Sequence, residues 1–158
     1  MKKPIIAVIS ALAGAAAGAG IVIGRTSKKI KNENDYGNKH LALYLMMNQW
    51  VKIKQENKSI AEYLENQGYR TIAIYGMNYV GETLLNELAG SDIEVKYAID
   101  KNAAIIYSDV DVITPDDELE AVDAVVVTPI TFFDEIEQVL GNKTDAPVIS
   151  LKDILDLI

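Results

Sequence analysis

The chain has 158 residues, which is enough for one domain and an appendage. Residues 1–31 carry six basic and no acidic side chains, so residues 32–158 hold the other 9 basic and 23 acidic ones, a net charge of −14. A body this acidic repels nucleic acid phosphates and argues against a DNA or RNA partner. The absence of cysteine excludes disulfides and thiolate chemistry, and nothing around the single histidine, His40, indicates a metal site.

The first predicted element is an uncharged segment of 21 residues, Pro4–Gly24. A helix of about 20 apolar residues crosses the hydrocarbon core of a bilayer. Two lysines precede this segment and four basic residues follow it within residues 25–31. The positive-inside rule then places the body of the protein in the cytoplasm. We therefore predict that residues 1–31 form a single-pass anchor in the cell membrane.

A cleaved secretory signal peptide is the alternative for the same segment. Lys2 and Lys3 resemble its basic start, and Ala17–Ala19 resembles a cleavage site. The apolar run, however, continues through Ile21–Ile23 and then ends in basic residues, which is a stop-transfer pattern. This continuation favours the retained anchor.

Residues 32–68 are interpreted as a linker and a helical arm. Residues 32–38 are polar and typical of a turn, and apolar residues recur at helical spacing over residues 39–55. The apolar stripe of this helix is wide, so we expect it to pack on the sheet, on a second copy of the chain or on a partner protein. A second helix is expected to begin near Ser59 and to end at Gly68.

The next segment reads as a nucleotide-binding unit. A buried strand over 70–75 is followed by Gly76, a helix over 82–88, a second strand over 94–99 and then Asp100. Strand, glycine turn, helix, strand and terminal acid occur in this order in dinucleotide-binding domains.

Each position of this unit has an expected role. Gly76 permits the tight turn, Gly81 lets the helix approach the strand, and the amides that begin at Met77 face a phosphate. Asp100 would accept hydrogen bonds from ribose hydroxyls and would repel the 2′-phosphate of NADP. Asn78 stands where the dinucleotide motif has its middle glycine, and its side chain occupies space that a pyrophosphate needs. A turn in an α/β scaffold that binds nothing is the alternative.

The second half of the chain continues the alternation of strands and helices. Thr114 is expected to cap a helix turn with Pro115 at its first position. The remaining elements are strands over 110–113, 124–128 and 147–150 and helices over 131–140 and 151–158. We predict an α/β fold for residues 69–158, a Rossmann-like doubly wound parallel sheet of about five strands with the order 3-2-1-4-5. Its ligand cleft would also be rimmed by Thr128 and Pro129.

Two stretches, Ile74–Glu82 and Tyr97–Asp100, resemble bacterial Rossmann-like domains that are associated with surface-polysaccharide biosynthesis. In those domains a helix similar to Gln49–Lys52 often precedes the fold. The domains are related to the NAD-binding domains of sugar-nucleotide epimerases and dehydrogenases. The resemblance covers residues 48–155 and implies that Gly76, Asn78, Gly81 and Asp100 contact a nucleotide.

Three functions are consistent with this sequence. The leading hypothesis is a membrane-anchored sensor or accessory subunit that binds NAD or a nucleotide sugar in cell-surface polysaccharide synthesis. The second is half of an NAD-dependent epimerase or oxidoreductase that a partner completes, and the third is a structural anchor domain without a ligand. The predicted rim offers no acid or base besides Asp100, so we assign no catalytic residue to this chain alone.

Overall fold

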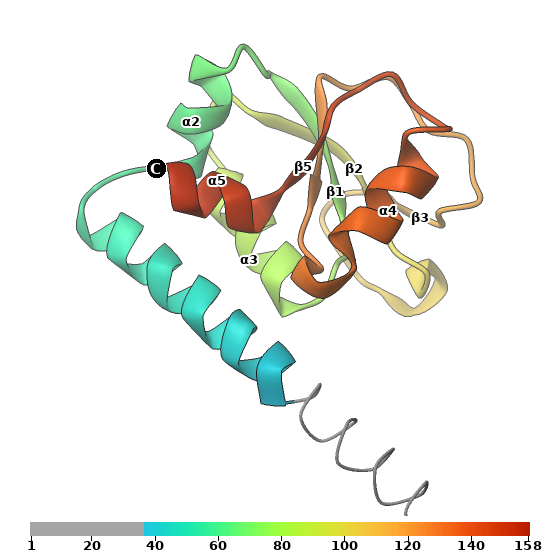
Figure 1. The fold of residues 1–158 in the computed structure, drawn as a ribbon. Coiled ribbons are helices and arrows are strands. Elements are labelled where there is room, and N and C mark those ends of the chain that lie inside the picture. The colour runs from blue at the N-terminus through green and yellow to red at the C-terminus, as the bar shows by residue number, and fades with distance from the viewer. Residues whose placement is uncertain (1–36) are drawn as a thin grey trace, which may run out of the picture. The chain divides into compact units, whose positions relative to one another are not determined.

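The computed structural model describes residues 37–158 (Figure 1). A helix covers residues 37–55, so Gly37 and Asn38, which we predicted to be linker, are helical. Within the described residues no helix combines the length and the hydropathy that a membrane crossing requires. The predicted anchor at residues 1–31 lies outside the described residues.

Residues 42–158 form one compact unit in which strands and helices alternate. The elements that follow the first helix are α2 Ile60–Asn66, β1 Thr71–Tyr75, α3 Tyr79–Leu88, β2 Glu94–Ile99, the 3₁₀ turn η1 Ala103–Ile105, β3 Val112–Ile113, β4 Ala124–Val127, the 3₁₀ turn η2 Ile130–Phe132, α4 Phe133–Leu140, β5 Val148–Ser150 and α5 Leu151–Leu157. The strands and the helices α2, α4 and α5 begin and end within two residues of their predicted bounds, whereas α3 begins at Tyr79, three residues before its predicted start.

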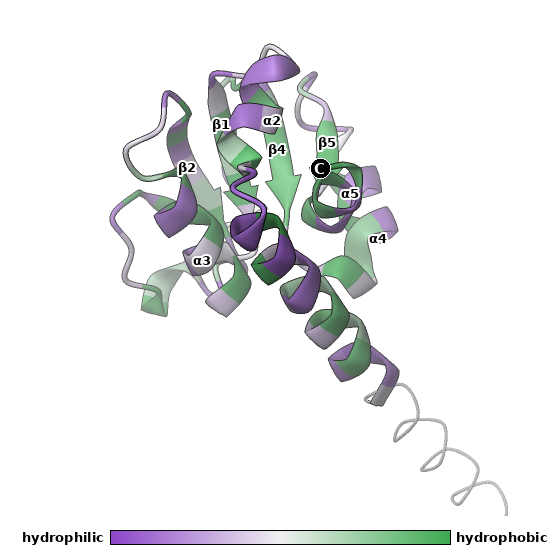
Figure 2. Ribbon diagram, turned by 90° about the vertical axis from the view of Figure 1, so that its left-hand side faces the viewer, coloured by the Kyte–Doolittle hydropathy of each residue, from purple (hydrophilic) through white to green (hydrophobic). Residues whose placement is uncertain are grey.

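The sheet has five parallel strands in the order β3-β2-β1-β4-β5, which confirms the predicted topology. Strand β4 is apolar along its whole length, and β1 is apolar after Thr71, as expected for strands that are covered on both faces of the sheet. Figure 2 shows β4 as uniformly hydrophobic, and all four of its residues are fully buried. Strand β1 lies at the point where the order reverses, with β2 on one side and β4 on the other. Ligands of doubly wound folds bind beside such a reversal.

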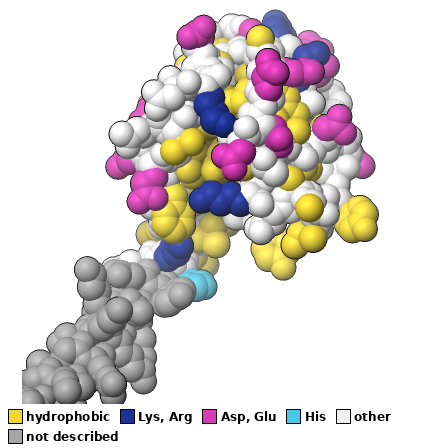
Figure 3. All heavy atoms as spheres, turned by 90° about the vertical axis from the view of Figure 1, so that its right-hand side faces the viewer, with side chains coloured by type: hydrophobic (Ala, Val, Ile, Leu, Met, Phe, Trp, Pro, Cys, Tyr) yellow, Lys and Arg dark blue, Asp and Glu magenta, His cyan; other side chains and the backbone are white. Residues whose placement is uncertain are grey.

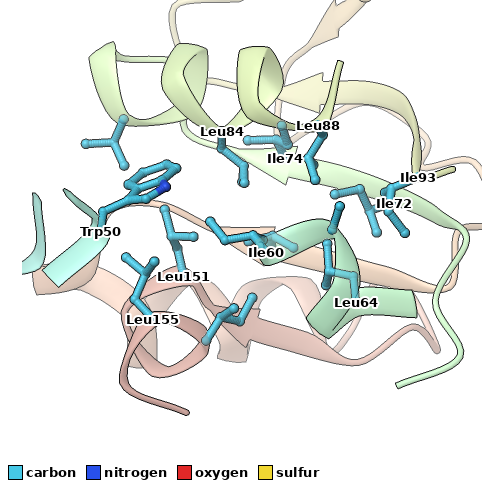
Figure 4. Packing of buried hydrophobic residues seen from close by; sticks show 14 of the residues in the cluster. Trp50, Ile60, Leu64, Ile72, Ile74, Leu84, Leu88, Ile93, Leu151 and Leu155 are labelled. Atoms are coloured by element: carbon cyan, nitrogen blue, oxygen red, sulfur yellow. The ribbon is translucent and has the colours of Figure 1, made fainter. Parts of the chain in front are cut away.

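Side chains that alternate along the strands separate two cores. Ile72 and Ile74 of β1 belong to the larger core, which α2, α3, α5 and the helix of residues 37–55 cover. Figure 4 shows the side chains of these helices meeting above the sheet. Ala73 and Tyr75 point into the smaller core, where α4 supplies the buried helix residues. We call the two sides of the sheet the thick face and the thin face.

The helix of residues 37–55 joins the thick face through one side only. Met46, Trp50 and Ile53, which are spaced by three and four residues, are at most 4% exposed. The indole Nε1 of Trp50 donates to Oε2 of Glu87 on α3 at 2.5 Å, and Lys54 Nζ lies 3.3 Å from Oε1 of the same carboxylate. The amide of Ile60 also donates to Oε1, at 3.3 Å. Glu87 therefore connects three segments of the thick face.

The segment between β3 and β4 differs from its prediction. We expected a helix turn that Thr114 would cap, but residues 114–123 form turns and irregular structure. The amide and the hydroxyl of Thr114 both donate to Oδ2 of Asp117, at 2.7 and 2.8 Å, and this local turn replaces the start of a helix. The segment then crosses the thin face, where Leu119 and Val122 pack against its core.

Candidate functional site

A cleft of about 730 Å³ lies at the carboxyl ends of the strands, on the side of the thin face. This volume falls within the range that small-molecule sites occupy. The loops after β1, β2, β3 and β4 contribute to it together with one side of α4. Its lining consists of Tyr75, Gly76, Asn78, Asp100, Lys101, Asn102, Thr114, Pro115, Asp116, Pro129, Phe132, Glu135, Ile136 and Val139.

Gly76 makes the turn that leaves β1, as the sequence indicated. Its φ is +94°, a conformation that side chains disfavour. A Cβ at this position would also lie 2.7 Å from both Thr128 Oγ1 and Pro129 Cδ. The Thr128 hydroxyl donates to the carbonyl of Gly76 at 2.7 Å. The ends of β1 and β4 are therefore fastened to each other directly beside the cleft.

Gly81 allows α3 to pack against the same turn. A Cβ on Gly81 would lie 2.1 Å from the carbonyl oxygen of Gly76, which is closer than any contact between these atoms. This confirms the role in helix–strand packing that the sequence predicted. Gly81 itself is buried and is not part of the cleft lining.

Asn78 is the N-cap of α3. Its backbone is extended, with φ −85° and ψ −169°, and its side-chain Oδ1 accepts a hydrogen bond from the Val80 amide at 3.0 Å. In a dinucleotide site the amides of this turn point to the phosphates. Here the Asn78 side chain accepts the hydrogen bond of one of these amides, that of Val80. The residue that replaces the middle glycine of the motif therefore caps the helix.

Asp100 follows β2 and lies in the cleft lining, as predicted. Its Oδ2 accepts the amide of Met77 at 2.9 Å, and its Oδ1 accepts the amide of Asn102 at 2.9 Å. Each carboxylate oxygen has lone pairs left for a further donor. Burial and, to a lesser extent, the charge of Asp100 raise the pKa of the nearby Tyr75 phenol above 10.0. The Tyr75 phenol therefore remains protonated at neutral pH.

The lining of the cleft combines acidic and apolar side chains. Asp100, Asp116 and Glu135 outnumber Lys101 in the lining. Figure 3 shows acidic side chains scattered over this side of the molecule, with hydrophobic ones between them. The apolar wall is formed by Pro115, Pro129, Phe132, Ile136 and Val139. Such a wall suits the flat ring of a nucleobase, whereas the carboxylates suit hydroxyl or amine groups.

The six predicted site residues have different positions around the cleft. Gly76, Asn78 and Asp100 line it. Met77 does not line the cleft, because its amide donates to Asp100 and its side chain is 3% exposed and lies in the core of the thick face. Thr128 is 2% exposed, and its hydroxyl donates to the Gly76 carbonyl from outside the cleft lining. Gly81 packs behind the turn.

Sequence reasoning missed the wall that α4 provides and the loop after β3. Phe132, Ile136 and Val139 recur at three- and four-residue spacing, which we interpreted only as helix periodicity. One side of an amphipathic helix faces a core, and the sequence does not show where that core ends and a cleft begins. Within residues 37–158 no group of three or more Asp, Glu or His side chains is arranged to hold a metal ion.

No family model matches the chain, and none of the curated proteins or solved structures with which it was compared is detectably similar.

Proposed function

We propose that this protein is a membrane-anchored domain that binds NAD or a nucleotide sugar in the cleft and acts as a sensor or accessory subunit, in the synthesis of cell-surface polysaccharide. The observation that carries the proposal is the position of Asp100. Asp100 follows the end of β2 and lines a cleft of about 730 Å³, together with apolar side chains such as Phe132 and Ile136. Hydroxyl groups of a ribose and one face of a base require these two surfaces together.

The ligand is recognised mainly through its nucleoside part. The four charged residues of the cleft (Asp100, Lys101, Asp116 and Glu135) have a net charge of −2, which opposes ligands with several phosphates. A pyrophosphate would lie at the first turn of α3, where Asn78 already holds the Val80 amide. NADP would bind more weakly than NAD, because its 2′-phosphate would lie beside Asp100.

Equilibrium binding to the full-length protein in detergent tests this proposal. We expect NAD or a uridine-diphosphate sugar to bind, and Asp100→Asn to weaken binding by about 5- to 150-fold, the equivalent of 1–3 kcal/mol. Asp92→Asn is the matched control, because its carboxylate is 85% exposed in the loop between α3 and β2, away from the cleft. Equal affinities of the Asp100 variant and the wild type would show that the ribose assignment is wrong.

A scaffold without a ligand is the second candidate, and one observation favours it. Asp100 and Asn78 already satisfy the amides of Met77 and Val80, so the turn does not need a phosphate to be stable. The variant Asn78→Gly separates the two candidates, since it frees the Val80 amide at a cost of a few tenths of a kcal/mol in helix capping. In a binding protein the affinity for NAD stays equal or rises. If no nucleotide binds to either protein at millimolar concentration, the scaffold is the correct interpretation.

A further inference from the structure

The helix of residues 37–55 has a second apolar side that nothing within the described residues covers. Tyr44 and Val51, which are seven residues apart and share one side of the helix, are 66% and 52% exposed, whereas Met46, Trp50 and Ile53 on the opposite side are buried. An amphipathic surface helix needs only one apolar side. Apolar side chains that are exposed along one line of a helix indicate an interaction surface.

The residues on this exposed side have the spacing of a coiled-coil seam. Tyr44, Asn48, Val51 and Gln55 are all exposed and follow one another at steps of four, three and four residues. Leu41 continues the pattern in the sequence, three residues before Tyr44. Alternating steps of three and four residues are the heptad pattern of a coiled coil, with Asn48 at an a position and Tyr44 and Val51 at d positions. We call Tyr44, Asn48, Val51 and Gln55 the seam.

We propose that two copies of this chain pair through the seam as parallel helices in register. An asparagine at an a position pairs best with the same asparagine of another copy, and this pairing selects parallel two-stranded coiled coils. A partner protein with a different sequence would have to supply a matching polar group at the same height. The seam of this chain supplies that group itself.

The charges beside the seam allow this pairing. Residues 37–55 contain no acidic side chain, and Lys52 and Lys54 lie on opposite sides of the seam. Lys54 is paired with Glu87 at 3.3 Å. In a parallel pair the flanking position of Met47 in one copy meets that of Lys52 in the other, so the aliphatic part of the lysine covers the methionine without a contact between like charges. An apolar groove of about 360 Å³ extends the contact surface on the side of Met47.

The seam is short, but its helix is already ordered. Gln49 Nε2 donates to the carbonyl of Leu155 at 3.3 Å, and Trp50 donates to Glu87. Isolated helices shorter than about 12–15 residues are only marginally stable. Because this helix is already formed in the single chain, pairing does not have to offset the free-energy cost of helix formation. The membrane anchor that we predict for residues 1–31 would hold copies in one bilayer and raise their effective concentration.

Disulfide trapping tests the proposal, because the chain has no cysteine of its own. Single variants Tyr44→Cys and Gln55→Cys are prepared in the full-length protein, reconstituted in lipid vesicles and oxidised mildly. Equivalent seam positions of a parallel pair approach to about 6 Å between Cα atoms, a distance that a disulfide spans. Leu43→Cys is the control, because Leu43 is 39% exposed on the same helix but points away from the seam.

We expect both seam variants to form dimers at least about ten times faster than Leu43→Cys. Equal rates at the three positions would overturn the proposal. So would a mixture of the two seam variants in which position 44 of one copy crosslinks to position 55 of the other in preference to its own equivalent, because that result means an antiparallel pair. Adding Val51→Glu to Tyr44→Cys should abolish the dimer while the melting temperature stays unchanged. An undiminished yield would show that another segment holds the copies together.

Discussion

Within residues 37–158, four helices cover the thick face of the sheet, whereas one helix and the irregular segment 114–123 cover the thin face. Side chains of the thick face, such as Leu64, Leu84 and Leu151, are fully buried. On the thin face the cover stops short of the carboxyl ends of the strands, and the cleft begins there. One sheet therefore supports a packed core on one side and an open binding surface on the other.

The largest expected difference between the faces concerns stability. Leu84→Ala on the thick face should cost about 2–5 kcal/mol in the free energy of unfolding, because it leaves a cavity among fully buried side chains. Val139→Ala on α4 is the matched change on the thin face, where the side chain is 50% exposed, and should cost less than about 1 kcal/mol. Urea unfolding measures both. Equal losses would mean that the cleft wall is as tightly packed as the core.

A glycine behind the cleft gives the next largest effect. Gly81→Ala places a methyl group 2.1 Å from the Gly76 carbonyl and should cost about 1–3 kcal/mol through the displacement of α3. It should also weaken any ligand that binds at the Gly76 turn. Gly141→Ala at the end of α4 is the control, since its φ of −60° suits alanine and its nearest contact is 3.2 Å. Unfolding curves that coincide for the two variants would contradict the tight helix–strand contact.

The contact through Glu87 should contribute less than the Gly81 packing. Glu87→Ala removes the acceptor of the Trp50 indole and of the Ile60 amide, and we expect a loss of about 1–2 kcal/mol, since an unsatisfied buried donor costs about that much. Hydrogen exchange should become faster in residues 42–55 and remain slow in β1 and β4. Glu82→Ala, an exposed change on the same helix, is the control. Uniformly faster exchange would show that Glu87 supports the whole domain instead of this contact.

The smallest expected effect is a pH-dependent change in stability. It arises at Asp123, at the amino ends of β1 and β4, whereas the cleft lies at the carboxyl ends. Hydrogen bonds from the Thr71 and Arg70 amides and from the Thr71 hydroxyl hold the pKa of Asp123 below 3.8. The ionised carboxylate therefore stabilises the fold at pH values above 3.8, and this contribution is lost as the pH falls through the lowered pKa of the folded state. We expect Asp123→Asn to melt at a lower temperature than the wild type at neutral pH, with the difference narrowing under acid. A difference that persists well below the lowered pKa would rule out the titration of Asp123 as its cause.

The sheet was predictable because β1, β4 and β5 are short apolar runs, β2 is rich in β-branched and aromatic residues, and turn signals separate the strands. Strand order followed from these runs and the right-handed rule. The segment after Thr114 was not predictable in the same way, because Thr114 and Pro115 suit a helix start, but Asp117 instead accepts hydrogen bonds from Thr114. The sequence does not show whether the Thr114 side chain caps a helix or donates to the Asp117 carboxylate.

The candidate site was predicted at its centre but not at its borders. Gly76 and Asp100 follow strand ends, and strand ends of a parallel sheet meet at one edge, so their proximity could be derived. The sequence could not show that Asp100 accepts a hydrogen bond from the Met77 amide or that Asn78 caps α3. Either side chain could instead form hydrogen bonds with a ligand. Glu87 was missed altogether, because a glutamate within a helix is usually exposed to solvent.

Trp50 gives the thick face a spectroscopic property that the thin face lacks. It is the only tryptophan of the chain, its side chain is 3% exposed, and its indole N–H is bound to a carboxylate. Fluorescence excited selectively from tryptophan therefore originates from one indole at the contact between the helix of residues 37–55 and α3. Lifting this helix from the domain would move the indole into water and shift its emission to the red, even if the sheet stayed folded. The emission maximum consequently reports the attachment of the helix in real time and without a label.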